Sequence, residues 1–244
     1  MLRRIAAVCG FGTLLFVFQG PVAYAQPDPP PEKPCPVDFV TPRRSAARGM
    51  YIEVDYGFDE NCRPVLIAVR TAPLPVPEDE QQPVSTDTDQ DTSEGRLAGR
   101  PAPLAALAAA TTNVCHTETW ETDFAYIRTT QVQNDTSYTW NGSAITSWGV
   151  TATKKLYFTW WYVSSGPSAS FTLFPSTGPI TNITGKAKAS FYCNGGPFCA
   201  NGPMYAITMN AYTYVNKSGG CSSNGTYSGT VIPGGHVLFR NWKN

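Results

Sequence analysis

Acidic side chains are missing from a long part of this 244-residue chain. No Asp or Glu occurs in residues 136–244, although seven Lys and Arg residues lie there. Chemistry that needs two carboxylates must therefore use residues before this stretch. The sequence also lacks a Gly-x-Ser-x-Gly elbow, a Ser-x-x-Lys pattern and any cofactor motif, so it does not indicate a serine hydrolase and we expect no cofactor.

Long hydrophobic runs are absent after the first residues of the chain. The basic Leu2-Arg3-Arg4 precedes an apolar stretch at 5–18, and Ala23-Tyr24-Ala25 is a small-residue cleavage site. This order is typical of a secretory signal peptide over residues 1–25, and the apolar stretch is too short for a retained membrane anchor. We therefore expect a secreted, extracellular protein with no transmembrane segment in the mature chain.

Cysteine is scarce but even in number once Cys9 leaves with the signal peptide. Six cysteines in an exported chain predict up to three disulfides, and a metal site is disfavoured because only His116 and His236 are available to join the thiols and no Cys-x-x-Cys is present. Two cysteines flank an N-terminal hairpin, two flank a five-residue turn, and the remaining two pair by elimination. The predicted pairs are Cys35 with Cys62, Cys193 with Cys199, and Cys115 with Cys221.

The first half of the mature chain reads as three segments. Residues 26–34 form a Pro-rich tail, residues 35–72 a β-hairpin unit, and residues 73–112 a disordered acidic, Pro- and Ala-rich linker. The hairpin strands are expected at 50–56 and 64–71. Because two strands alone are not stable in water, the hairpin must dock, and the C-terminal domain is the obvious surface.

Residues 113–244 predict an all-β domain, an antiparallel β-sandwich or small barrel of about 8–10 strands. No segment shows a sustained helical period. Turn signals at 133–135 and 165–167 divide the expected strands, and the aromatic-rich 155–164 segment is expected to be a central strand. The expected strands are 114–122, 126–133, 136–141, 144–151, 155–164, 168–174, 185–193, 204–215, 225–231 and 236–241.

The strand near 204–215 alternates most clearly. Its inward set is predicted to be Tyr205, Ile207, Met209, Ala211 and Val215, and its outward set includes Thr208, Asn210, Tyr212 and Tyr214. Side chains two residues apart share a face, so the two tyrosines are expected about 7 Å apart as a binding platform beside the amide and the hydroxyl. The competing interpretation places both tyrosines in the core, covered by the hairpin or by the second sheet.

Charge is divided unevenly along the mature chain. Residues 26–112 carry 8 basic and 14 acidic groups, whereas residues 113–244 carry 8 basic and 4 acidic groups. A basic exported domain attracts an anionic cell-wall polymer or polysaccharide, or its own acidic linker, and a dispersed surface charge with no partner is the alternative. No basic tract of the nucleic-acid-binding type is present, so we expect no nucleic acid partner.

Few side chains are candidates for catalysis. Glu121 and Asp123 share a face in a regular strand, with Glu118 on the opposite face, and His116 is a conceivable base. The leading hypothesis is a non-enzymatic extracellular binding or adhesion module for a cell-surface or glycan ligand. One alternative is a small secreted hydrolase that uses Glu121 and Asp123, and another is a secreted inhibitor or toxin that acts on a protein or a membrane.

Overall fold

The computed structural model describes residues 35–74, 95–98, 110–195, 199, 205–231 and 234–244. The predicted signal peptide and Pro-rich tail, and most of the predicted linker, lie outside the described residues. The described part of the chain contains no helix with the length and hydrophobicity that a membrane crossing requires.

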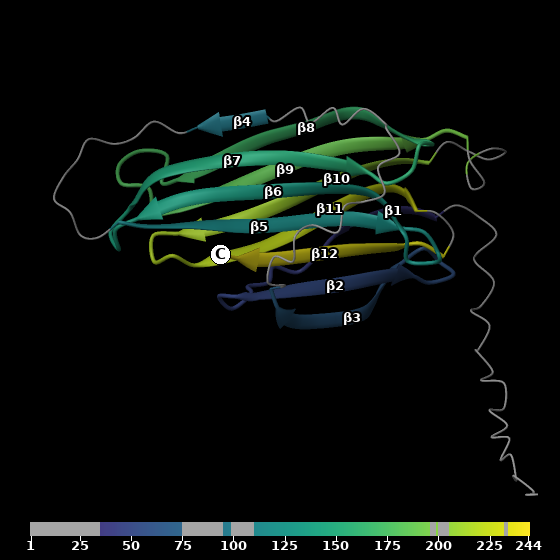
Figure 1. Ribbon diagram of the computed structural model, residues 1–244, viewed down its shortest axis with the longest axis horizontal. Coiled ribbons are helices and arrows are strands. Elements are labelled where there is room, and N and C mark those ends of the chain that lie inside the picture. Colours follow the sequence, from purple (N-terminus) through teal and green to yellow (C-terminus); the bar gives the residue numbers. More distant parts are fainter. Residues whose placement is uncertain (1–34, 75–94, 99–109, 196–198, 200–204, 232–233) are drawn as a thin grey trace, which may run out of the picture.

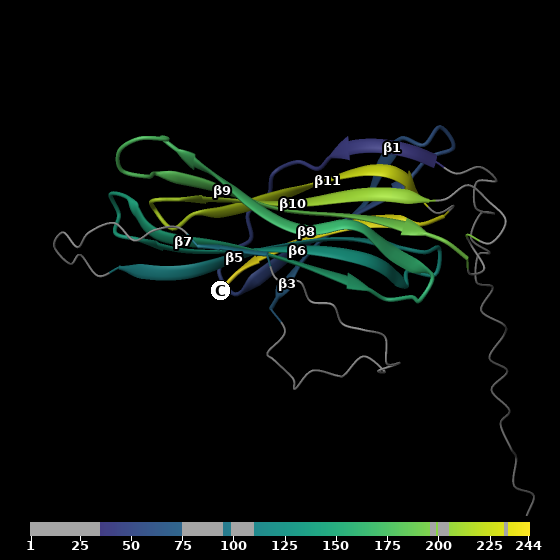
Figure 2. The same cartoon turned by 90° about the horizontal axis from the view of Figure 1, so that it is seen from above.

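Two antiparallel sheets pack face to face as a β-sandwich, which confirms the predicted fold class (Figures 1 and 2). One sheet has the order β1-β11-β10-β9-β8 and is called sheet A here; the other has the order β3-β2-β12-β5-β6-β7, is extended at one edge by the short β4, and is called sheet B. The strands of sheet A are β1 (Cys35–Val40), β8 (Trp161–Phe174), β9 (Asn182–Cys193), β10 (Ala206–Asn216) and β11 (Cys221–Val231). The strands of sheet B are β2 (Met50–Phe58), β3 (Pro64–Pro73), β4 (Gly95–Ala98), β5 (Thr111–Thr122), β6 (Arg128–Trp140), β7 (Ile145–Leu156) and β12 (His236–Lys243).

The N-terminal hairpin docks on the rest of the chain by adding strands to it. β2 pairs with β12 and extends sheet B, whereas β1 pairs with β11 at the edge of sheet A. Backbone hydrogen bonds and a shared core therefore solve the stability problem that two isolated strands would have. Within the linker expected to be disordered, Gly95–Ala98 instead form β4, which pairs with β7.

Two predicted turns are wrong because the strands run through them. β6 continues through residues 133–135, where the amide of the buried Asn134 donates a 2.9 Å hydrogen bond to the carbonyl of Ala211 on the opposite sheet. β8 continues through residues 165–167, where register shifts and the positive φ of Gly166 absorb the irregularity. Asn, Gly and Pro signalled turns locally, but a contact with the facing sheet in β6 and pairing with β9 in β8 keep the strands continuous.

The prediction of a central strand at 155–164 is also wrong. Leu156 ends β7, residues 157–160 form the connection, and β8 lies at the free edge of sheet A. Two aromatic residues of this connection contact each other: Phe158 and Trp160 stack with ring centroids 4.6 Å apart. Both rings are only partly buried against the core.

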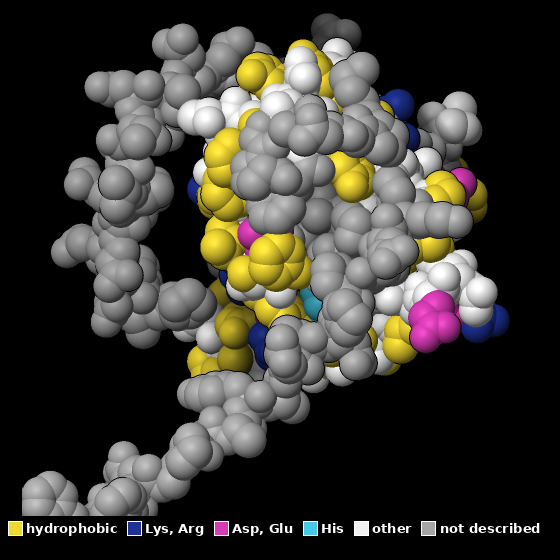
Figure 3. Space-filling view, turned by 90° about the vertical axis from the view of Figure 1, so that its right-hand side faces the viewer, with side chains coloured by type: hydrophobic (Ala, Val, Ile, Leu, Met, Phe, Trp, Pro, Cys, Tyr) yellow, Lys and Arg dark blue, Asp and Glu magenta, His cyan; other side chains and the backbone are white. Residues whose placement is uncertain are grey.

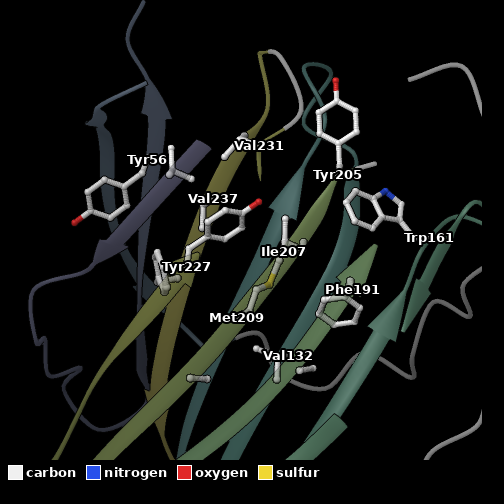
Figure 4. Close-up of a cluster of buried hydrophobic side chains, with 14 of the residues drawn as sticks. Tyr56, Val132, Trp161, Phe191, Tyr205, Ile207, Met209, Tyr227, Val231 and Val237 are labelled. Carbon is white, nitrogen blue, oxygen red and sulfur yellow. The ribbon is translucent and has the colours of Figure 1, made fainter. Parts of the chain in front are cut away.

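The core between the sheets follows the period-two pattern of the strands. The predicted inward residues of β10 are all buried, and Figure 4 shows Ile207 and Met209 pointing between the sheets near Phe191 and Tyr227. Aliphatic and aromatic side chains from both sheets form this cluster, and a smaller cluster surrounds Tyr138. Burial of such faces on both sheets is the main stabilising contribution to a sandwich.

A polar layer inside the sandwich fixes the backbone of β10. Thr119, Asn134 and Thr117 reach from sheet B and donate hydrogen bonds to the carbonyls of residues 210, 211 and 212, at distances of 3.4, 2.9 and 3.3 Å. Each bond satisfies a buried polar side chain and also ties β10 to the facing sheet. The backbone of β10, the strand that contains Tyr212 and Tyr214, is therefore fixed by hydrogen bonds from sheet B on its inner side.

All three predicted disulfides are present. Cys35 is bonded to Cys62, Cys115 to Cys221, and Cys193 to Cys199. The first joins β1 of sheet A to the turn after β2 of sheet B, and the second joins β5 to the start of β11. Three disulfides indicate that the protein folds in an oxidising environment.

Candidate functional site

Tyr212 and Tyr214 lie on the outer face of sheet A, as the alternation predicts. Both side chains are partly buried, and their ring centroids are 6.4 Å apart with planes inclined by 16°. The alternative that placed them in the core is wrong, because the hairpin extends sheet B and both rings point away from the facing sheet. The structure thus presents two nearly parallel rings on a surface strand.

Each of these rings carries a cation. The guanidinium carbon of Arg43 lies 3.4 Å from the ring centroid of Tyr214, and Nζ of Lys186 lies 5.4 Å from that of Tyr212. Both distances are within the range of a cation–π interaction. Arg43 covers one side of its ring, so the platform is a mixed surface of rings and positive charge rather than two open rings.

The polar residues predicted beside the tyrosines form short hydrogen-bonded links across the strands. The hydroxyls of Thr208 and Ser190 are 2.8 Å apart, and the amide of Asn210 donates a 2.6 Å hydrogen bond to the hydroxyl of Thr226. The hydroxyl of Tyr214 donates a 3.0 Å hydrogen bond to Oδ1 of Asn224. Asn210 is only 8% exposed, so its main contact is the hydrogen bond to Thr226 on the neighbouring strand. Thr208 is more exposed to solvent.

A second tyrosine pair lies on the same face, and the sequence reasoning missed it. Tyr162 on β8 and Tyr192 on β9 are direct cross-strand neighbours with ring centroids 5.2 Å apart. Their outward position follows from the strand period, but the incorrect strand boundary at 155–164 hid it. Arg43 was missed for another reason, since its contact with β10 spans most of the chain and has no local signal.

The outer face of sheet A is rich in cations and poor in acids. Arg43, Lys186 and Lys188 lie on it, and within the described residues none of them forms an ion pair with a carboxylate. β8 to β11 contain no Asp or Glu, and Asp38 is on the edge strand β1. We name this surface, defined by Arg43, Tyr162, Lys186, Lys188, Tyr192, Thr208, Asn210, Tyr212 and Tyr214, the tyrosine face.

The two carboxylates of the hydrolase hypothesis have separate structural partners. Glu121 is fully buried between the sheets, where it accepts hydrogen bonds from the hydroxyls of Tyr227 at 3.1 Å and Thr129 at 3.2 Å. Burial, reinforced by this carboxylate, raises the pKa of Tyr227. Asp123 lies beyond the end of β5, and its Oδ1 accepts hydrogen bonds from the backbone N–H groups of Ala125 and Ile127. Such bonds are typical of a side chain that closes a turn.

This turn also exposes apolar side chains. Phe124, Tyr126 and Ile127 are each about half exposed. They lie in the connection between β5 and β6, at the end of the sandwich that Figure 3 faces, where hydrophobic side chains gather along one edge. The tyrosine face is a separate surface on the other sheet.

The outer face of sheet B carries a charge network that the sequence did not reveal. Glu53 accepts a 2.6 Å hydrogen bond from Arg240, whose guanidinium lies over the rings of Tyr51 and Trp120. Glu118 lies across the strand from Arg240 and accepts a 2.9 Å hydrogen bond from Gln131. Burial raises the pKa of Glu118, and the nearby positive charges of arginine and lysine oppose that rise.

Both histidines lie on this same outer face, each beside an aspartate of its own. Nδ1 of His116 is 2.7 Å from Asp135, and the imidazole stacks on Trp242 with centroids 4.7 Å apart. Nδ1 of His236 is 2.8 Å from Asp55. Among the described residues, no group of three His, Cys, Asp or Glu side chains is placed to hold a metal ion.

These two outer faces are the chemically distinctive surfaces of the described sandwich. On sheet B, Arg240 over Tyr51 is also bonded to Glu53, whereas on sheet A, Arg43 over Tyr214 forms no ion pair with a described carboxylate. The chain matches no protein-family model, no curated protein and no solved structure, so a functional assignment depends on this geometry alone.

Proposed function

We propose that this protein is a non-enzymatic extracellular binding module whose tyrosine face binds an acidic polysaccharide. The observation that carries the proposal is the pair of parallel rings at Tyr212 and Tyr214, each beside a cation that has no described acidic partner. The signal-peptide pattern and the three disulfides support the extracellular location.

The chemistry of the tyrosine face suits a charged sugar chain. A pyranose ring has an apolar face that stacks on an aromatic ring, and tyrosine provides this area with little loss of conformational entropy. Arg43, Lys186 and Lys188 attract carboxylates, and the partly buried hydroxyls of Thr208 and Ser190, which are 2.8 Å apart, offer hydrogen bonds to sugar hydroxyls. A polyol phosphate chain satisfies the charge but has no ring to stack, so we favour a polysaccharide.

The strand that carries the rings is rigid on its inner side. Three side chains of sheet B hold consecutive carbonyls of β10, and the hydroxyl of Tyr214 is fixed by Asn224. Groups that are already ordered before binding lose less entropy when the ligand arrives. This arrangement supports recognition of an extended chain on a preformed surface.

The hydrolase alternative has weaker support from the geometry. Glu121 is buried between the sheets and bonded on both oxygens, and Asp123 holds a turn. A glycosidase needs its two carboxylates beside a bound sugar, one as an acid and the other as a base or nucleophile. The inhibitor or toxin alternative would use the half-exposed apolar side chains of Phe124, Tyr126 and Ile127, whereas the rings and cations of the tyrosine face favour the binding module.

Retention on insoluble polysaccharides tests the proposal. The protein is mixed with insoluble polygalacturonate or with cellulose, and the fraction that sediments is measured at low and high salt. We expect retention on the acidic polymer, less retention at high salt because exposed charges are screened, and little retention on cellulose. Replacing both tyrosines, Tyr212→Ala with Tyr214→Ala, should weaken retention at least about 30-fold, as loss of a central aromatic contact does.

Tyr51→Ala is the matched control for this experiment. Tyr51 is also a partly buried surface tyrosine under an arginine, but its arginine is bonded to Glu53 on sheet B. We expect Tyr51→Ala to leave retention unchanged. Equal retention of the wild type and the double variant, with both folded by their unfolding midpoints, would contradict the proposed function.

A further inference from the structure

A pocket opens beside Tyr214 of the tyrosine face. The strands β10, β11 and β12 that border it are labelled in Figure 1, where the C-terminus follows the end of β12. The volume of the pocket is about 310 Å³, and it lies between the segment at 45–48, the turn from β10 to β11 and the end of β12. The side chain of Tyr214 contributes to its wall, so the pocket and the ring pair share a residue. A cavity of this size is at the lower end of the range for small-ligand sites and suits one sugar unit.

The pocket contains two cations and no carboxylate. Arg48 and Lys243 both line it, and none of its lining residues is acidic. Burial lowers the pKa of Lys243, and the charge repulsion with Arg48 lowers it further. Within the described residues neither side chain forms an ion pair, so an anion in the pocket would relieve this repulsion.

The turn that forms one wall is fixed in place. Oδ1 of Asn216 accepts hydrogen bonds from the N–H groups of Ser218 and Gly220, and Cys221 is bonded to Cys115. Gly219 has a φ of +76°, and a Cβ on it would lie 2.3 Å from the ring of Trp140, so only glycine fits there. Its carbonyl accepts hydrogen bonds from Tyr138 and from the ammonium of Lys243. The position of this ammonium is therefore set before any ligand binds.

We propose that this pocket receives one carboxylate group of the acidic polysaccharide, with Arg48 and Lys243 as its ligands. The inference rests on the proposed function, because Tyr214 belongs both to the ring pair and to the wall of the pocket. Arg48 offers a planar fork that matches a carboxylate, and Lys243 offers a fixed point charge. Charge in the pocket thus selects a uronate over a neutral sugar.

Calorimetric titration with soluble oligosaccharides tests this assignment. The probes are trigalacturonate, its fully methyl-esterified form, which has the same length and no charge, and inorganic phosphate. We expect trigalacturonate to bind more tightly than its ester. Arg48→Met and Lys243→Met should each weaken trigalacturonate binding at least about tenfold, as loss of a hydrogen bond to a charged group does, and should leave ester binding unchanged.

Lys217→Met is the matched control, since Lys217 is exposed in the same turn but does not line the pocket. We expect it to change trigalacturonate binding less than about twofold, the effect of one screened surface charge. Arg48 is exposed and makes no ion pair among the described residues, so its variant should fold even if Lys243→Met does not.

The outcomes separate the two proposals. If the protein is retained on polygalacturonate but Arg48→Met binds trigalacturonate as Lys217→Met does, the pocket assignment is wrong and the proposed function stands. If the wild type neither sediments with polygalacturonate nor binds trigalacturonate, both fail. If inorganic phosphate binds in an Arg48-dependent manner more tightly than trigalacturonate, the carboxylate assignment is overturned in favour of a phosphate-bearing polymer.

Discussion

The two outer faces of the sandwich use the same kinds of side chain in opposite ways. On sheet B, Arg240 lies over Tyr51 and Trp120 and is bonded to Glu53 at 2.6 Å. On sheet A, Arg43 lies over Tyr214, and no carboxylate of the described residues pairs with it. We infer that Arg43, unlike Arg240, is available to a ligand because the described residues supply it with no counter-charge.

This contrast originates in the order of the strands along the chain. β8 to β11 come from the stretch without Asp or Glu and are neighbours in sheet A, whereas β2, β5 and β6 carry Glu53, Glu118 and Asp135 into sheet B. Arg240 on β12 enters sheet B between β2 and β5 and finds a carboxylate on either side. The uneven charge of the sequence thus becomes a difference between two surfaces.

The largest expected effect is on stability and concerns sheet B. Glu53→Ala removes the carboxylate that pairs with Arg240 and Arg70, and it leaves the partly buried guanidinium of Arg240 with only Glu118 across the strand. We expect the free energy of unfolding to fall by about 3 kcal/mol, near the lower end for breaking a buried ion pair. Denaturant unfolding measures this change.

Lys188→Ala on the tyrosine face provides the comparison, since Lys188 is exposed and unpaired among the described residues. It should change the free energy of unfolding by less than about 0.5 kcal/mol. The contrast between the two faces is wrong if Glu53→Ala lowers the free energy of unfolding no more than Lys188→Ala does.

An intermediate effect is expected on binding. Lys186→Ala with Lys188→Ala removes two cations from the tyrosine face, so affinity for trigalacturonate should fall about five- to tenfold, from roughly 0.5 to 0.7 kcal/mol for each exposed charge contact. The salt dependence of binding should also become weaker. Calorimetry at two salt concentrations checks both results, and an unchanged salt dependence would show that the charges of this face do not meet the ligand.

The smallest expected effect concerns the pH dependence of stability. Burial raises the pKa of Glu118 in the folded protein, so the folded state holds this proton more tightly than the unfolded chain does. Protonated Glu118 therefore contributes to the free energy of unfolding at pH values below the ordinary pKa of 4.5. This contribution is lost as the pH rises through the raised pKa of the folded protein. The variant Glu118→Gln cannot ionise at this position, so its free energy of unfolding should not show this loss as the pH rises.

The measurement is the difference in the free energy of unfolding between the wild type and Glu118→Gln as the pH rises above 4.5. The predicted direction is wrong if the free energy of unfolding of the wild type rises relative to that of the variant over this pH range. A parallel experiment with Asp38→Asn on the edge of sheet A controls for the loss of a carboxylate elsewhere.

The parts of the fold that the sequence predicted depend on local alternation and on chain order. β10 alternates strictly, so its buried set and its outward tyrosines could be assigned from the period of a strand. The disulfide pairs followed because two pairs of cysteines flank short turns or hairpins, and elimination assigned the third. Apart from the third disulfide, whose cysteines are 106 residues apart, each of these signals lies within a short stretch of sequence.

The parts that the sequence could not predict depend on contacts between distant segments. Asn134 signals a turn, but its amide is satisfied by the facing sheet, so β6 runs through it. Arg43 reaches Tyr214, and Arg48 meets Lys243, only because β1 and its continuation lie along the edge of sheet A. The charge network of sheet B was likewise invisible, since Glu53, Glu118 and Arg240 come from three separate parts of the chain.

The most direct test of the account is a map of the backbone amides that respond to trigalacturonate in an NMR titration. We expect the largest shift changes around Lys186, Tyr212, Tyr214 and the turn at 216–220, with little change around Glu118 and Trp120. Shift changes concentrated on the outer face of sheet B, or none on β10, would contradict the assignment of the tyrosine face as the ligand-binding surface.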